Sequence, residues 1–173
     1  MFQFYQFNKL VRVFCDDIVP IVQANRVNES GNHWWVVLLE KGYAKFCGSY
    51  EKTNGGFPRY SFYHLTGGIC VDIDLHRRQT EYQTTRLFRI LNQLMRTKII
   101  VMNAGNKAGQ VHGLVKYHAY SILQLEKVRK VGENRQEVRL IQLRNPHGKG
   151  GVEWNGTWSD RSSAWETLSD RTR

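Results

Sequence analysis

GLVKYHAYSIL (113–123) and VRLIQLRN (138–145) are the two stretches that decide the fold, because apolar and polar residues alternate along both. Alternation of this kind is typical of β-strands. The residues between them are strongly polar and include Gly132, which suits a turn. The sequence therefore predicts an antiparallel hairpin that turns around 131–132.

The same hairpin brings together the two side chains best suited to chemistry. A register with His118 opposite Asn145 also places Leu125 opposite Val138, so that apolar residues face apolar residues. Directly opposed residues have Cβ atoms about 4.5–5.5 Å apart. The Asn145 carboxamide would then accept the imidazole N–H, fix its tautomer and leave the second ring nitrogen to take a proton from a nucleophile. This is the orienting half of a Cys, His, Asn arrangement. Taken alone, the spacing is weak evidence, because a lone histidine on a strand is more often structural and Asn-Pro is more often a plain strand end.

The length and composition are those of one ordinary globular domain. The chain has 173 residues and an apolar share of 41%, enough to bury a core. No apolar run is long enough to cross a membrane, and no charged start followed by an apolar stretch indicates a signal peptide. We therefore expect a cytoplasmic protein without a transmembrane segment.

The three cysteines, Cys15, Cys47 and Cys70, are an odd number without paired spacing. This argues against a disulfide framework and against a zinc site, and favours reduced, buried thiols. None is suited to be a nucleophile. Cys47 is expected at a helix C-terminus, where the dipole disfavours a thiolate, and the other two are expected on strands with apolar neighbours.

A formal net charge of +10 raises the question of a polyanionic partner. The basic residues are spread along the chain, and only 127–139 is locally dense, where Glu133 and Glu137 interrupt it. A solvated hairpin turn is the better interpretation of that stretch. Nucleic acid is an unlikely partner, and anionic lipid is an equally weak alternative.

The remaining patterns predict alternating short elements. Glycine at position 42, inside the expected first helix, would cost about 1 kcal/mol relative to alanine. Together the elements make an α+β protein. They are two short strands over 2–15 joined around Asn8 and Lys9, a buried helix over 33–46 stopped by Gly48, a loop over 51–62, a strand over 69–75, a helix over 81–96, a strand over 98–103 and a loop over 103–110.

Several ordered segments resemble the calpain family of cysteine endopeptidases. They are HGLVKYHAYSI (112–122), LIQLRNPHG (140–148), VEWNGTWSD (152–160), LLEKGYAKFCGSYE (38–51) and LTGG (65–68), with FQFYQF and DDIVP near the start. The resemblance implies a papain-like α+β core of the calpain type, truncated at both ends. Residues 1–66 would be a remnant of the nucleophile-bearing subdomain, and 67–173 the incomplete His and Asn subdomain with its antiparallel sheet.

The function that this resemblance implies is calcium-dependent hydrolysis of peptide bonds in intracellular proteins. A thiolate would attack the carbonyl, His118 would carry the proton and Asn145 would orient the imidazole. Glu153 and Asp160 correspond to calcium ligands of the family, and their hard oxygens suit Ca²⁺. Because such a site needs about six to eight oxygens, we expect only a partial calcium site. Protein substrates, and possible regulatory protein partners, follow from the same resemblance.

Three departures from the family pattern support an alternative function. The G-D-C-W motif that carries the nucleophile does not occur in these 173 residues. His147 replaces the Trp of the family's N-P-W-G, and His33 replaces an acidic residue that binds calcium in the first subdomain. The alternative is therefore a catalytically inactive pseudoprotease fragment that acts as a protein-binding module.

Overall fold

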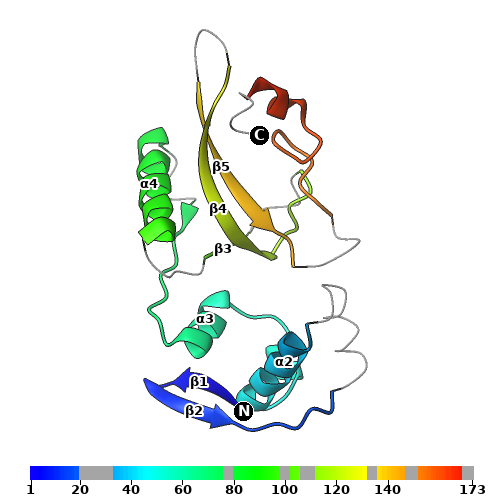
Figure 1. Cartoon of the computed structure of the whole chain (residues 1–173). Helices are drawn as coiled ribbons and strands as arrows, with labels where there is room; N and C mark the ends of the chain where they lie inside the picture. Colours follow the sequence, from blue (N-terminus) through cyan, green and yellow to red (C-terminus); the bar gives the residue numbers. More distant parts are fainter. Residues whose placement is uncertain are drawn as a thin grey trace. The chain divides into compact units, whose positions relative to one another are not determined.

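The computed structural model describes residues 1–19, 33–75, 80–97, 102–105, 112–131, 136–146 and 152–168. Its chain divides into two compact units, Met1–Ile73 and Asp74–Arg173. The described residues form a mixed α+β structure with three α-helices and antiparallel sheets (Figure 1). None of the helices in these ranges is long and apolar enough to cross a membrane. His147 and most of the predicted strand 98–103 lie outside the described residues.

The first unit begins with the predicted hairpin. Strands β1 (Phe2–Gln6) and β2 (Lys9–Val13) pair antiparallel, with Gln6 opposite Lys9. The two turn residues, Phe7 and Asn8, have φ of +48° and +59°. Positive φ at both positions gives the turn the twist that two-residue hairpins favour, and asparagine tolerates it well. The hairpin prediction is confirmed, with the turn one residue earlier than expected.

The helix predicted over 33–46 is confirmed as α2 (Trp34–Cys47), which ends at Gly48 with φ of +108°. The prediction that it is buried is confirmed in part. Val37, Gly42 and Ala44 are buried and most of the other residues are half-buried, whereas Trp34 and Trp35 at its start are 58% and 64% exposed. The hairpin and the short helix η1 (Glu51–Thr53) contact this helix.

The core of the first unit is a small aromatic cluster. Phe4 of β1 is fully buried, and its ring centroid lies 5.6 Å from that of Tyr43 and 4.9 Å from that of Phe46. The Tyr43 hydroxyl lies 3.0 Å from Nδ1 of His64. Burial lowers the pKa of His64, because desolvation disfavours the charged ring. The cluster ties α2 to the hairpin and to the helix that carries His64.

Two predictions in this unit are wrong. The predicted loop over 51–62 contains η1 and the start of α3 (Pro58–Thr66), where Pro58 occupies the first turn, a position that tolerates proline. The predicted strand over 69–75 forms no ladder, and Ile69 and Val71 are 96% and 77% exposed. Alternation predicts a strand only where a partner strand supplies hydrogen bonds.

The second unit contains helix α4 (Glu81–Thr97) and a three-stranded antiparallel sheet in the order β3-β4-β5. The strands are β3 (Asn103–Gly105), β4 (Ala119–Arg129) and β5 (Glu137–Arg144). Figure 1 shows α4 beside β4, and Asn92 of the helix donates its side-chain N–H to the Leu125 carbonyl at 3.1 Å. The predicted helix over 81–96 and the predicted β4–β5 hairpin are both confirmed.

The core of the second unit lies along β4. Its buried side chains come from α4, β4 and the segment that follows the short helix η3 (Ser163–Thr167). Leu168 pairs with Lys130 in an isolated bridge, which holds this later segment against the end of β4. The buried apolar residues are Phe88, Tyr120, Leu125, Val128 and Leu168.

We predict that Gly42→Ala destabilises the chain, although alanine is the better helix former by about 1 kcal/mol. A Cβ at Gly42 would lie 2.6 Å from Cδ2 of Phe2. Overpacking of this kind costs about 1–3 kcal/mol, so we expect a net loss of about 1 kcal/mol in the free energy of unfolding. Urea denaturation measures it.

The matched control is the double variant Phe2→Ala and Gly42→Ala. Removing the ring leaves room for the new methyl group, so Gly42→Ala should stabilise the chain in the Phe2→Ala background. Stabilisation by Gly42→Ala in the unmodified chain would contradict the proposed role of this glycine.

Candidate active site

The two residues singled out from the sequence, His118 and Asn145, are in direct contact. Nε2 of His118 lies 2.9 Å from Oδ1 of Asn145. The amide Nδ2 of Asn145 donates to the Val152 carbonyl at 3.2 Å, which makes Oδ1 the acceptor that faces the ring. An amide oxygen only accepts, so Nε2 carries the hydrogen and Nδ1 is the basic nitrogen of the neutral ring.

The register that produces this contact differs from the predicted one. Ile122 pairs with Leu143 and Gln124 with Gln142, so Leu123 is an extra residue on β4. The predicted pairing of Leu125 with Val138 is wrong, since Leu125 pairs with Ile141. An extra residue on one strand is a β-bulge, which locally re-aims side chains.

The bulge explains how His118 still reaches Asn145. Ser121 pairs with Arg144, and continuing this count by one residue places Tyr120 opposite Asn145. His118 is two residues from Tyr120 and so lies on the same face of the sheet. The two side chains are therefore diagonal neighbours, which remain within reach for long side chains.

Sequence reasoning missed two groups around this pair, the Val152 carbonyl and Tyr120. The Tyr120 ring is 5% exposed and meets the His118 ring in a T-shaped arrangement, with centroids 4.8 Å apart. A backbone carbonyl leaves no signal in sequence. The alternation in this stretch does place Tyr120 on the same face as His118, so the sequence could have predicted that the Tyr120 ring lies beside the imidazole.

The three cysteines are free thiols of the first unit. Cys70 is exposed, and its Sγ lies 3.1 Å from the Arg59 carbonyl. The expectation of buried thiols is therefore wrong for Cys70, because the segment that carries it forms no strand. Cys15 and Cys47 are half-buried. Among the described residues, Lys41 interacts electrostatically with Cys15.

The two predicted calcium ligands, Glu153 and Asp160, both have exposed side chains. The described part of the chain holds no group of three or more His, Cys, Asp or Glu side chains that could bind a metal ion. Carboxylate oxygens suit Ca²⁺, but two residues supply only part of the six to eight oxygens it takes. His33 is exposed at the start of α2.

Hydrogen bonds from tryptophan side chains brace the segment 153–165, which carries both carboxylates. Nε1 of Trp154 donates to the Thr157 carbonyl at 2.9 Å, and Nε1 of Trp165 donates to the Ser159 carbonyl at 2.7 Å. The Trp158 and Trp165 rings form a T-shaped pair with centroids 5.1 Å apart. Trp154 is 38% exposed.

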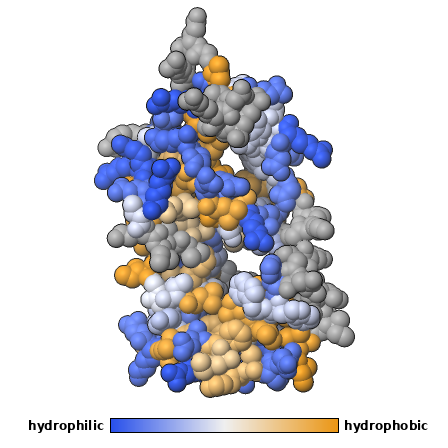
Figure 2. Space-filling model, viewed as in Figure 1, coloured by the Kyte–Doolittle hydropathy of each residue, from blue (hydrophilic) through white to orange (hydrophobic). Residues whose placement is uncertain are grey.

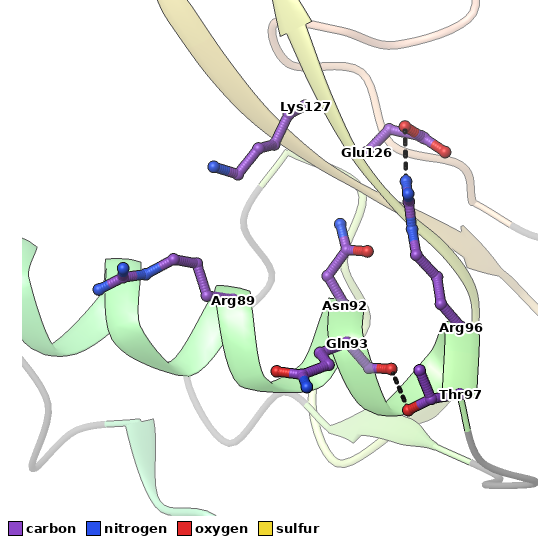
Figure 3. A pocket seen from close by; sticks show the side chains of 7 residues that line it. All are labelled: Arg89, Asn92, Gln93, Arg96, Thr97, Glu126 and Lys127. Carbon is purple, nitrogen blue, oxygen red and sulfur yellow. Dashed lines mark hydrogen bonds and ion pairs between the residues drawn. The ribbon is translucent and has the colours of Figure 1, made fainter.

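A cavity of about 390 Å³ lies between α4 and β4 (Figure 3). Its lining includes neither His118 nor Asn145. Two of its cations face carboxylates, with Arg96 4.0 Å from Glu126 and Lys127 3.1 Å from Glu137. The lining residues are Arg89, Asn92, Gln93, Arg96, Thr97, Glu126 and Lys127.

The positive charge of the chain is concentrated in the second unit. Residues 74–173 contain 18 Lys and Arg against nine Asp and Glu, which gives +9 of the total +10. Hydrophilic residues cover much of the face of this unit that Figure 2 shows. Ion pairs such as those around the cavity partly neutralise this surface.

A histidine directly before a strand, with its ring against an asparagine amide, fits the Cys, His, Asn arrangement of papain-like cysteine proteases. Residues 1–173 match the family described as calpain family cysteine protease, and the chain belongs to that family. It is 37% identical over 177 residues to Calpain-8 of Homo sapiens and to the Calpain-1 catalytic subunit of Homo sapiens. It is also 34% identical over 178 residues to Calpain-9 of Rattus norvegicus. These alignments cover 97–99% of this chain, which spans about a quarter of the length of each relative.

We predict that Asn145→Ala allows the His118 ring to adopt both neutral tautomers. This substitution removes the Oδ1 acceptor at 2.9 Å, and with it the hydrogen bond that selects the Nε2–H form. The ¹⁵N shifts of the ring should change from mainly one neutral tautomer to a mixture, at a pH where the ring is uncharged.

Gln142→Ala, which removes an exposed amide from the same strand, is the matched control and should leave the ring signals unchanged. Identical imidazole spectra for the unmodified chain and Asn145→Ala would show that the hydrogen bond does not set the tautomer.

Proposed function

We propose that this chain supplies the general base and the orienting amide of a calcium-dependent cysteine endopeptidase that cleaves proteins in the cytoplasm. The observation that carries the proposal is the 2.9 Å contact between Nε2 of His118 and Oδ1 of Asn145. Membership of the calpain family supports the reaction class. In this proposal residues 1–66 belong to the nucleophile-bearing part of a papain-like core, and residues 67–173 form the His and Asn subdomain.

The proposed chemistry requires the thiol of a G-D-C-W segment, a motif that these 173 residues do not contain. Nδ1 of His118 takes the thiol proton as sulfur bonds to the peptide carbonyl carbon. The imidazolium returns the proton to the amine as the C–N bond breaks, leaving an acyl-enzyme thioester. His118 then removes a proton from water, which attacks the thioester and regenerates the thiol.

Asn145 contributes to these reaction steps through the imidazole of His118. Its Oδ1 accepts the Nε2 hydrogen in both the neutral and the charged ring, so the ring keeps one orientation through both proton transfers. The Val152 carbonyl in turn fixes the amide by accepting from Nδ2. Holding a base in place in this way avoids reorientation during the reaction.

Glu153 and Asp160 are proposed to provide part of a calcium site. Both carboxylates are exposed, and both belong to the tryptophan-braced loop at 153–165 that follows the Val152 carbonyl. Calcium bound there would neutralise the two charges and order the loop, and through Val152 would influence the amide of Asn145.

A chimaera tests the proposed reaction. The G-D-C-W segment of the human Calpain-1 catalytic subunit is joined ahead of this chain, and the subunit's downstream residues are added after it. We expect calcium-dependent cleavage of casein that His118→Ala abolishes and Gln142→Ala leaves unchanged. A folded chimaera that binds casein without cleaving it would favour the protein-binding module instead, and a folded chimaera without either activity would refute the proposal.

The calcium site has its own test in the same chimaera. Glu153→Gln and Asp160→Asn each remove a hard, charged ligand, so each should raise the calcium concentration for half-maximal cleavage by about tenfold, as for loss of about 1.4 kcal/mol of binding. Glu166→Gln, an exposed carboxylate of η3, is the matched control. An unchanged calcium requirement in the two ligand variants would exclude these residues from the site.

A further inference from the structure

Tyr120 occupies a central position beside the proposed catalytic pair. It is 5% exposed at the start of β4, two residues after His118, and the register places it opposite Asn145. The three side chains therefore share one face of the sheet. Since the chemistry assigned to His118 rests on the proposed function, the role inferred for Tyr120 rests on it too.

The Tyr120 ring restricts the imidazole directly. The two ring centroids are 4.8 Å apart and the ring planes meet at 85°. This is the T-shaped arrangement that aromatic pairs favour. Because the phenol ring is buried, it has little freedom to follow a rotation of the imidazole.

The hydroxyl of the same residue closes the turn that leads into His118. The Val115 N–H donates to the Tyr120 hydroxyl at 2.8 Å. Between them Tyr117 has φ of +56°, a left-handed conformation that is unfavourable for a bulky residue. The Tyr117 side chain is 79% exposed, so core packing does not hold this conformation. A strained backbone beside a reactive residue persists only when its surroundings fix it.

We propose that Tyr120 is a positioning residue for His118. Its ring sets the plane of the imidazole, and its hydroxyl locks the strained turn so that Nε2 stays against Asn145. The residue acts in two separable ways, which allows each to be removed alone. Tyr120→Phe keeps the ring and removes the hydroxyl, whereas Tyr117→Gly removes the strain that the hydroxyl opposes.

The first test uses the 173-residue chain and needs no activity. In Tyr120→Phe, we expect hydrogen exchange of the Val115 amide to quicken at least tenfold and the ¹⁵N signals of His118 to change towards a mixture of tautomers. Adding Tyr117→Gly should restore a single tautomer, because glycine adopts positive φ at no cost. Tyr60→Phe, an exposed tyrosine of α3, is the control. Unchanged ring signals in Tyr120→Phe, or no recovery with Tyr117→Gly, would overturn the proposal.

The second test uses the chimaera and distinguishes this inference from the proposed function. We expect Tyr120→Phe to lower kcat by about 10- to 100-fold with KM nearly unchanged, because a misplaced base slows chemistry and leaves binding intact. A rise in KM at constant kcat would contradict a positioning role. If the parent chimaera is inactive while the imidazole signals respond as expected, the endopeptidase proposal fails and the role of Tyr120 in fixing His118 stands.

Discussion

The extra residue at Leu123 is the constraint on which the proposed site depends. Beyond the bulge, Gln124 pairs with Gln142. If the strands kept that register without the extra residue, Asn145 would lie opposite Ser121. The Ser121 side chain points to the opposite face from those of His118 and Tyr120. One inserted residue therefore moves Asn145 to the face of the imidazole. Bulges are common beside active sites for this reason.

Much of the fold was predictable because several elements have strong local signals. The turn at Phe7 and Asn8, the apolar run of α2 and the period of α4 each specify their element without distant contacts. The errors arose where tertiary context decides. The segment 69–75 alternates well and yet has no partner strand, whereas 58–66 has an irregular pattern and forms α3. Local pattern carries no information about which neighbours are present.

The site divides in the same way. His118 and Asn145 were predictable from their motifs, and their contact is confirmed, although the predicted register was two residues out on the site side of the bulge and three residues out beyond it. A shift of two preserves the face of a strand, which is why a wrong register gave the right pair. The Val152 carbonyl is a backbone group, and the turn held by Tyr120 depends on backbone conformation. Side-chain patterns in the sequence predict neither.

The two hydrogen bonds of Asn145 also indicate why an amide suits this position better than a carboxylate. The side chain must accept from Nε2 of His118 and donate to the Val152 carbonyl. Aspartate would keep the first bond but would turn a second acceptor towards that carbonyl, and its charge would favour the protonated imidazole. A ring that is already protonated has to lose its proton before it can take one from a thiol. An asparagine orients the base without placing a charge beside it, so the chemistry of the proposed reaction and the local hydrogen bonding select the same residue.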